Sequence, residues 1–166
     1  MWNQLSIFFK DYPKQKKIAQ KMLEYGLRTH NQKIYCGPIE LSDSKLARAL
    51  DVDRRAITAT ITTITNNPEL QTIFSKLTPT CHLKDVAPAM NWGVIEIIPK
   101  DPSTPGILAA VATLIADHHI SIRQAIGDDF ELSEEPRLFI VTEKPVPGTL
   151  IPKIRNAHGV KAVLIY

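Results

Sequence analysis

A largely polar stretch with two prolines, residues 78–91, divides this chain of 166 residues near its middle. Pro79 and Pro88 among mixed polar residues are typical of a linker or an irregular crossing segment. On both sides the apolar residues follow the periods of helices or strands. The sequence therefore predicts two small domains, one in residues 1–80 and one in residues 92–166.

Charge is distributed unevenly between the two halves. Residues 1–80 contain 12 Lys and Arg against 7 Asp and Glu, a balance of +5. Residues 81–166 contain 8 against 10, a balance of −2, and the two values sum to the net charge of +3. This asymmetry favours a polyanionic partner for the first half, and a merely solvated basic surface is the alternative.

Several protein classes are not expected from the sequence. The longest apolar stretch, residues 106–116, is too short to cross a bilayer, and the first residues lack the layout of a signal peptide, so we expect a cytoplasmic protein without membrane contact. Cys36 and Cys81 are expected to be thiols rather than a disulfide. Together with His30 and His82 they lack the paired spacing of zinc ligands, so we expect no metal site and no cofactor.

The first half contains four segments with helical patterns. They cover residues 14–27, 43–50, 54–64 and 68–77. Ser42 and Asp53 are residue types that cap helices, and they precede the second and third segments. In the third segment Ile57, Ile61 and Ile64 recur at helical spacing. Its β-branched threonines and partial alternation make a strand the alternative, but the spacing of Ile64 favours a helix.

The second and third helices, joined by a three-residue turn, resemble the helix-turn-helix of bacterial and archaeal transcription regulators. Ala47, Leu50, Val52 and Ile57 match the framework positions of that family. Asp51 stands where the family usually has Gly in a left-handed conformation, which Asp tolerates better than most residues.

This resemblance implies a DNA-binding surface on the second helix of the pair. Arg54 and Arg55 would contact phosphates or guanine edges, and Thr58 and Thr62 would reach groove or backbone atoms of double-stranded DNA. The alternative is a three-helix bundle that serves only for dimerisation or for docking on a partner.

The second half alternates apolar segments in the order β-α-β-β-α-β. We expect strands at residues 93–99, 120–126, 138–142 and 160–166, and helices that start near Ile107 and Leu150. This order predicts a ferredoxin-like domain, in which two helices cover one face of a four-stranded antiparallel sheet. The chain as a whole is therefore expected to be an α+β protein, with a helical domain followed by this sheet domain.

The loop between the first strand and the first helix of this domain, residues 101–108, resembles the amino-acid-binding loop of ACT domains. In that family a Pro-Gly pair brings the backbone close to a ligand at a helix N-terminus, where free N–H groups favour a carboxylate. The resemblance implies a ligand site made of Asp101, Ser103, Thr104, Pro105, Gly106 and Ile107, with Asp101 suited to an amino group.

Taken together, the two halves resemble the archaeal predicted regulators of amino-acid metabolism that contain an ACT domain. The resemblance implies an amino-acid-responsive transcriptional regulator that binds double-stranded DNA and dimerises through its ACT sheet. Alternatives are a sheet kept only for dimerisation, or a regulatory subunit that docks on a biosynthetic enzyme. RNA binding is disfavoured because the basic half lacks interleaved aromatic residues. No constellation of catalytic residues is found, so an enzyme is not expected.

Overall fold

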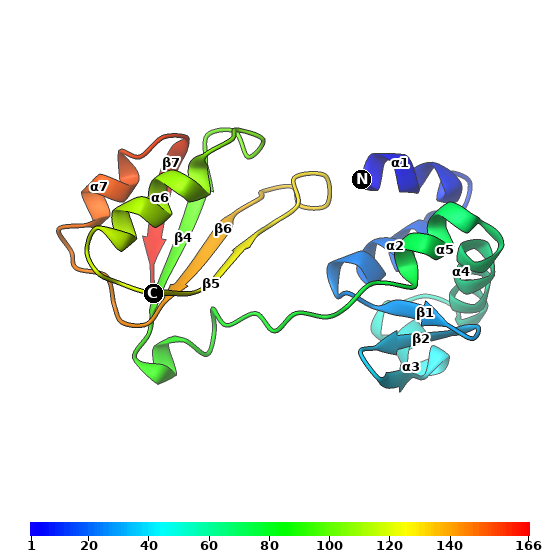
Figure 1. Ribbon diagram of the computed structural model, residues 1–166. Coiled ribbons are helices and arrows are strands. Elements are labelled where there is room, and N and C mark those ends of the chain that lie inside the picture. The colour runs from blue at the N-terminus through cyan, green and yellow to red at the C-terminus, as the bar shows by residue number, and fades with distance from the viewer. The chain divides into compact units, whose positions relative to one another are not determined.

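The computed structural model describes residues 1–166 and divides the chain into two compact units, Met1–Cys81 and His82–Tyr166. It contains seven α-helices and two antiparallel sheets, one of three strands and one of four (Figure 1). The protein is therefore of the α+β class. None of its helices combines the length and the apolar character needed to cross a membrane.

The first unit contains the four helices expected from the sequence. Its elements are α1 (Trp2–Leu5), the 3-10 helix η1 (Ser6–Phe9), α2 (Pro13–Glu24), β1 (Arg28–His30), β2 (Lys33–Cys36), β3 (Ile39–Leu41), α3 (Asp43–Ala49), α4 (Arg54–Asn66) and α5 (Pro68–Phe74). The segment that could have been a strand is the helix α4, as the spacing of its isoleucines predicts. Ile57, Ile61 and Ile64 are all buried.

The expectation of a purely helical first domain was wrong, because β1, β2 and β3 form an antiparallel sheet in that order. Asn31 and Gln32 connect β1 to β2, and both have positive φ angles, 46° and 57°. This is the backbone of a tight hairpin turn, made here without glycine. Ile34 in the central strand is completely buried, so the sheet contributes to the core of the unit.

Helix α4 lies at the centre of the first unit and contacts α2, α3 and α5. Ile18 and Met22 of α2, Ile61 of α4, and Leu70 and Phe74 of α5 are buried in this unit. The apolar face of α4 is therefore covered from several sides, while the face that carries Arg54, Arg55, Thr58 and Thr62 remains exposed.

The connection between α3 and α4 uses the left-handed backbone that the sequence predicts. Asp51 has a φ angle of 52°. Asp53 caps α4 as expected, since its carboxylate accepts a hydrogen bond of 2.7 Å from the backbone N–H of Arg55. Ser42 occupies the corresponding position before α3, but its hydroxyl makes no capping hydrogen bond, so that prediction was wrong.

The second unit has its strands and helices in the order β-α-β-β-α-β. Its elements are the 3-10 helix η2 (Pro88–Met90), β4 (Gly93–Pro99), α6 (Ile107–Ala116), β5 (Ile122–Gly127), β6 (Leu138–Thr142), α7 (Ile151–Arg155) and β7 (Val160–Ile165). The sheet order is β5-β6-β4-β7, and every neighbouring pair is antiparallel. Figure 1 shows α6 and α7 on the same face of this sheet.

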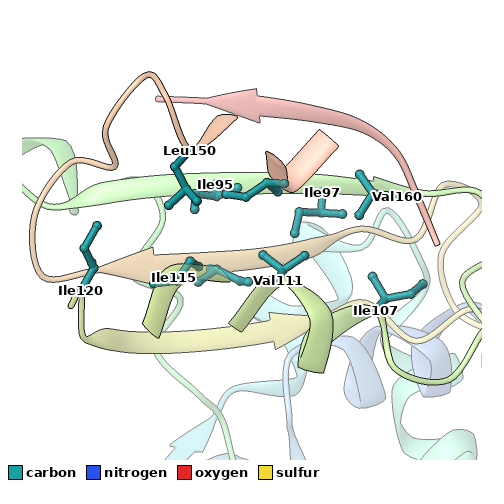
Figure 2. Close-up of a cluster of buried hydrophobic side chains, with 10 residues drawn as sticks. Ile95, Ile97, Ile107, Val111, Ile115, Ile120, Leu150 and Val160 are labelled. Atoms are coloured by element: carbon teal, nitrogen blue, oxygen red, sulfur yellow. The ribbon is translucent and has the colours of Figure 1, made fainter. Parts of the chain in front are cut away.

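An apolar core fills the space between the sheet and these two helices (Figure 2). Ile95 and Ile97 of β4 extend toward Val111 and Ile115 of α6, and Ile154 of α7 belongs to the same buried cluster. All five side chains are completely inaccessible to solvent. Burying a large aliphatic side chain contributes about 1.5–3 kcal/mol, so the five buried side chains of this layer together stabilise the second unit strongly.

The second half of the expected linker packs against the other face of the sheet. Side chains that alternate along a strand point to opposite faces, so Val94 lies on the face away from Ile95. There it forms a small buried cluster with Ala87 and Val141. The backbone N–H of Leu83 also donates a 2.9 Å hydrogen bond to the Gln124 side chain. Residues 82–91 therefore belong to the second unit, as an irregular segment rather than as a linker, and this unit begins before the expected boundary at residue 92.

The turn at Asp51 gives a first testable prediction. A β-branched residue in the left-handed region costs about 1–2 kcal/mol, whereas glycine adopts it freely. We expect Asp51→Val to lower the free energy of unfolding by about that amount, and Asp51→Gly to leave it unchanged or slightly raised. Urea unfolding followed by circular dichroism measures both. Equal stability of the two variants would contradict the left-handed conformation.

Candidate functional site

The exposed face of α4 brings together all four residues for which the sequence predicts DNA contact. Arg54 and Arg55 lie in its first turn, and neither guanidinium forms an ion pair. Both positive charges are therefore available to a partner. The Thr62 hydroxyl donates to the carbonyl oxygen of Thr58 over 3.0 Å, so toward a partner it is disposed to accept rather than donate a hydrogen bond.

A groove of about 840 Å³ runs along this face of α4. Its lining comes from α4 and from the start of α2, and consists of Tyr12, Gln15, Asp53, Arg54, Arg55, Thr58, Ala59, Thr62 and Thr63. The sequence analysis identified the α4 side of this groove and missed Tyr12 and Gln15. Because these two residues lie about 40 positions before α4, only the packing of α2 against α4 brings them there.

The predicted ligand loop lies between β4 and α6. The Asp101 carboxylate accepts hydrogen bonds from the backbone N–H of Ser103 over 2.9 Å and from its hydroxyl over 2.7 Å. The hydrogen bond from the Ser103 hydroxyl, and to a smaller extent that from its backbone N–H, hold the pKa of Asp101 below its ordinary value. One oxygen of the carboxylate takes both bonds, so the other remains open to a ligand.

Pro105 and Gly106 are exposed at the start of α6 rather than covered by packed side chains. Gly106 has a φ angle of 90°, and a Cβ added to it would lie 4.0 Å from the Cδ2 atom of His158. Thr104 is half-buried beside the neighbouring Gly159. The structure therefore adds residues 158–159 to the surroundings of the loop, which the sequence analysis did not do.

Ile107 differs from the other residues of the predicted ligand site. Its side chain is 7% exposed and points into the core of the second unit (Figure 2). It could therefore offer a ligand only its backbone N–H group, at the first position of α6.

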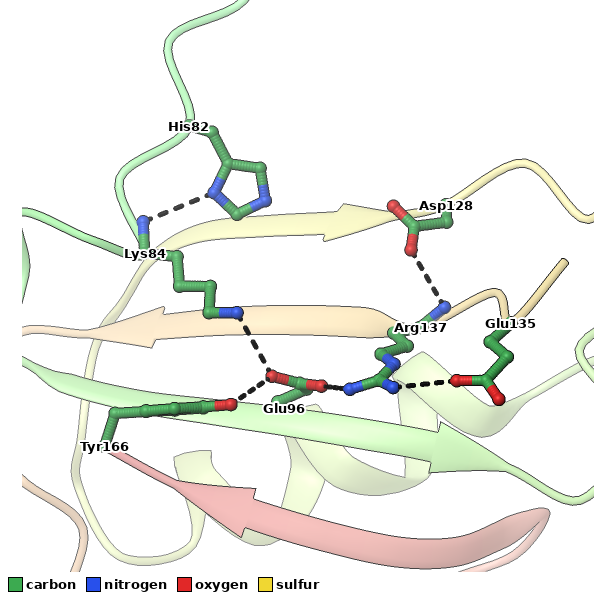
Figure 3. Close-up of polar contacts among 7 residues, drawn as sticks. All are labelled: His82, Lys84, Glu96, Asp128, Glu135, Arg137 and Tyr166. Atoms are coloured by element: carbon green, nitrogen blue, oxygen red, sulfur yellow. Dashed lines mark hydrogen bonds and ion pairs between the residues drawn. The ribbon is translucent and has the colours of Figure 1, made fainter. Parts of the chain in front are cut away.

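A polar cluster that the sequence analysis missed surrounds Glu96 on the face of the sheet away from α6 and α7 (Figure 3). Glu96 is only 1% exposed. One carboxylate oxygen forms an ion pair with Arg137, and the other accepts hydrogen bonds from the Lys84 ammonium at 3.3 Å and the Tyr166 hydroxyl at 2.7 Å. Arg137 is also bonded to Glu135 at 2.9 Å.

This arrangement determines the protonation of Glu96. Burial by itself raises the pKa of the carboxyl group, but the hydrogen bonds from Arg137, Tyr166 and Lys84 outweigh it and hold the pKa below its ordinary value. Both oxygens already have partners. Glu96 is therefore better suited to connect β4 with residues 84 and 166 than to act as a general base or to bind a ligand.

Comparison with known proteins adds little. No protein-family model matches the chain, and no curated protein matches it. Among the solved structures that resemble it weakly are that titled "Gly102Thr mutant of Rv3291c" and that titled "Crystal structure of PH0061". The first is 14% identical, with a TM-score of 0.30 over 90% of this chain and 87% of that one. The second is 16% identical, with a TM-score of 0.27 over 92% and 90%.

The Glu96 cluster gives a prediction about pH. Because the pKa of Glu96 is lower in the folded than in the unfolded state, its contribution to stability is complete above about pH 4.5 and is lost as the pH falls through the folded-state value. We expect Glu96→Gln to lower the free energy of unfolding at neutral pH by about 2–3 kcal/mol.

Urea unfolding of the unaltered protein and of Glu96→Gln, between neutral and acidic pH, measures the difference in their free energies of unfolding. The difference between them should shrink as the pH falls. A difference independent of pH would show that the charge of Glu96 does not stabilise the fold.

Proposed function

We propose that the protein is an amino-acid-responsive transcriptional regulator that acts in the cytoplasm. In this proposal α3 and α4 form a helix-turn-helix that binds double-stranded DNA, and the second unit is an ACT domain that binds the effector. The observation that carries the proposal is the exposed face of α4, where Arg54 and Arg55 lie without ion-pair partners beside Thr58 and Thr62.

The chemistry of this face suits a nucleic acid. Two arginines that have no acidic partners would break no ion pair when they bind phosphates. The arginine side chain can form paired hydrogen bonds with a phosphate or a guanine edge. Thr62, whose hydroxyl proton is already used within the helix, would accept a hydrogen bond from an adenine or cytosine amino group. Phosphate contacts would position α4, and contacts with base edges would select a sequence.

The chemistry of the loop at residues 101–106 suits an amino acid. The free N–H groups at the start of α6 favour a carboxylate, and the Asp101 carboxylate, ionised at neutral pH, favours an ammonium group. Ser103 orients Asp101, and the left-handed Gly106 keeps side-chain atoms away from the approach to α6.

A homodimer would connect the two activities. The outer strands of the sheet, β5 and β7, each have one edge without a neighbouring strand, and pairing of such edges between two copies would cover them. An effector that binds two dimer geometries unequally would shift the population between them and change the spacing of the two α4 helices.

The DNA-binding half is tested by replacing both arginines. We expect Arg54→Ala with Arg55→Ala to weaken binding to all DNA sequences and to reduce the salt slope of log K by about 0.9 for each phosphate that the variant no longer neutralises. Fluorescence anisotropy with labelled duplexes at several salt concentrations measures both. If the unaltered protein binds no DNA at low salt, the DNA-binding half of the proposal is wrong.

The effector-binding half is tested by a thermal-shift screen against the common amino acids. A ligand at 100 times its Kd stabilises the folded protein by about 2.7 kcal/mol, so a specific effector should measurably raise the midpoint temperature of unfolding. Gly106→Val should abolish the shift, because it places a branched side chain in a left-handed backbone beside His158. No shift with any amino acid would count against an effector of this class.

A regulatory subunit that docks on an enzyme is the second candidate. Two large apolar side chains of the first unit are strongly exposed, Ile7 at 69% and Ile39 at 64%, and such residues occur at protein interfaces. Co-purification of an amino-acid biosynthetic enzyme, together with indifference to DNA at low salt, would favour this function.

A further inference from the structure

Gln15 has an unusual position for a polar side chain. It is only 9% exposed, and its carbonyl oxygen accepts a 2.8 Å hydrogen bond from the Thr63 hydroxyl. The side chains of Thr58, Thr60, Thr62 and Thr65 donate instead to the carbonyl four residues earlier in α4. Gln15 is therefore held against α4 by its oxygen. Its amide nitrogen makes no hydrogen bond, and the residue is part of the lining of the groove.

Tyr12 lies beside Gln15 in the same groove. Its side chain is 57% exposed, and its hydroxyl has no hydrogen-bond partner. A second hollow of about 430 Å³ also includes Tyr12 and Gln15, and adds Lys14 and Asp11 to its lining. The two hollows share Tyr12 and Gln15, and the lining of the second is mostly apolar.

The charged residues around these two hollows are three cations and two acids, so the positive charges exceed the negative ones by one. Arg54, Arg55 and Lys14 carry positive charges, and Tyr12 and Gln15 add neutral donors. Of the two acids present, Asp53 already accepts a hydrogen bond from the backbone of α4. Asp11 is exposed, and its charge would oppose an anion. A phosphate, which offers only acceptors, complements such a lining.

We propose that the start of α2 is a second DNA-contacting element, in which Gln15, Tyr12 and Lys14 bind a phosphate of the DNA backbone next to the site of α4. This inference rests on the proposed DNA-binding function and extends it to a different helix. When a helix lies in the major groove, the sugar-phosphate strands run along its sides. Helix α2 packs against α4, so the start of α2 would lie near one of these strands. The Gln15 amide and the Tyr12 hydroxyl would donate to one phosphate, and Lys14 would neutralise charge on the same strand.

Two substitutions test the neutral donors. Gln15→Glu keeps an oxygen for Thr63 but replaces the amide donor by a second oxygen with negative charge. A hydrogen bond to a charged group is worth about 1.5–3 kcal/mol, so we expect a loss of affinity of about tenfold to a hundredfold. Tyr12→Phe removes only an exposed hydroxyl and should weaken binding about tenfold without affecting the fold. Neither loss should depend on the DNA sequence, since phosphates carry no sequence information.

Two further substitutions test the charges. Lys14→Ala should reduce the salt slope of log K by about 0.9, whereas the matched control Lys76→Ala, at a residue outside the groove, should leave it unchanged. Asp11→Asn should strengthen binding roughly twofold to fivefold, because it removes a repulsive exposed charge. A gain of affinity cannot result from partial unfolding, so this variant separates a direct contact from a structural effect.

Fluorescence anisotropy with duplex DNA, at several salt concentrations, provides the measurement, and circular dichroism verifies the fold of each variant. The inference would be overturned if Gln15→Glu and Tyr12→Phe were folded and bound DNA with the affinity of the wild type. If the variant with Arg54→Ala and Arg55→Ala still bound DNA weakly, the proposed function would remain intact. No binding by the unaltered protein would overturn both. Binding of a single nucleotide as tightly as a duplex would assign the groove to a small phosphorylated ligand instead.

Discussion

The second unit depends on the alternation of side chains along its central strand β4. Ile95 and Ile97 face α6 and α7, whereas Val94 and Glu96 face the opposite side, and all four are nearly or completely buried. The strand also pairs with β6 on one edge and β7 on the other. One strand of seven residues thus joins the apolar layer under the helices, the cluster that holds residues 82–91, and the charged cluster around Glu96.

Most of the fold follows from apolar periodicity in the sequence. The helix α4 was predicted correctly despite its threonines, because three isoleucines keep a helical spacing over two turns. The three-stranded sheet of the first unit was missed because strands of three or four residues are too short to establish a period. The hairpin turn at Asn31 and Gln32 contains no glycine, so the usual indication of a tight turn was absent as well.

The candidate sites depend more heavily on tertiary structure. Arg54 and Arg55 could be identified locally, from their place after a cap at the start of a helix. Gln15 could not, because its importance arises only from its contact with Thr63, 48 positions later. Glu96 lies between these cases. A single acid in an otherwise apolar strand indicates a buried charge that needs a partner, but the sequence does not say that Arg137, Lys84 and Tyr166 supply the partners.

The threonines of α4 have a consequence for how the first unit behaves on heating. Four of them bond to the helix's own carbonyls, an arrangement that weakens rather than strengthens a helix, and β-branched residues have low helical propensity. This segment would therefore hardly form a helix as an isolated peptide. Its helical shape comes from the isoleucines packed beneath it, so the face that carries Arg54 and Arg55 cannot persist in a partly melted protein, and loss of the core removes the binding surface in the same cooperative step.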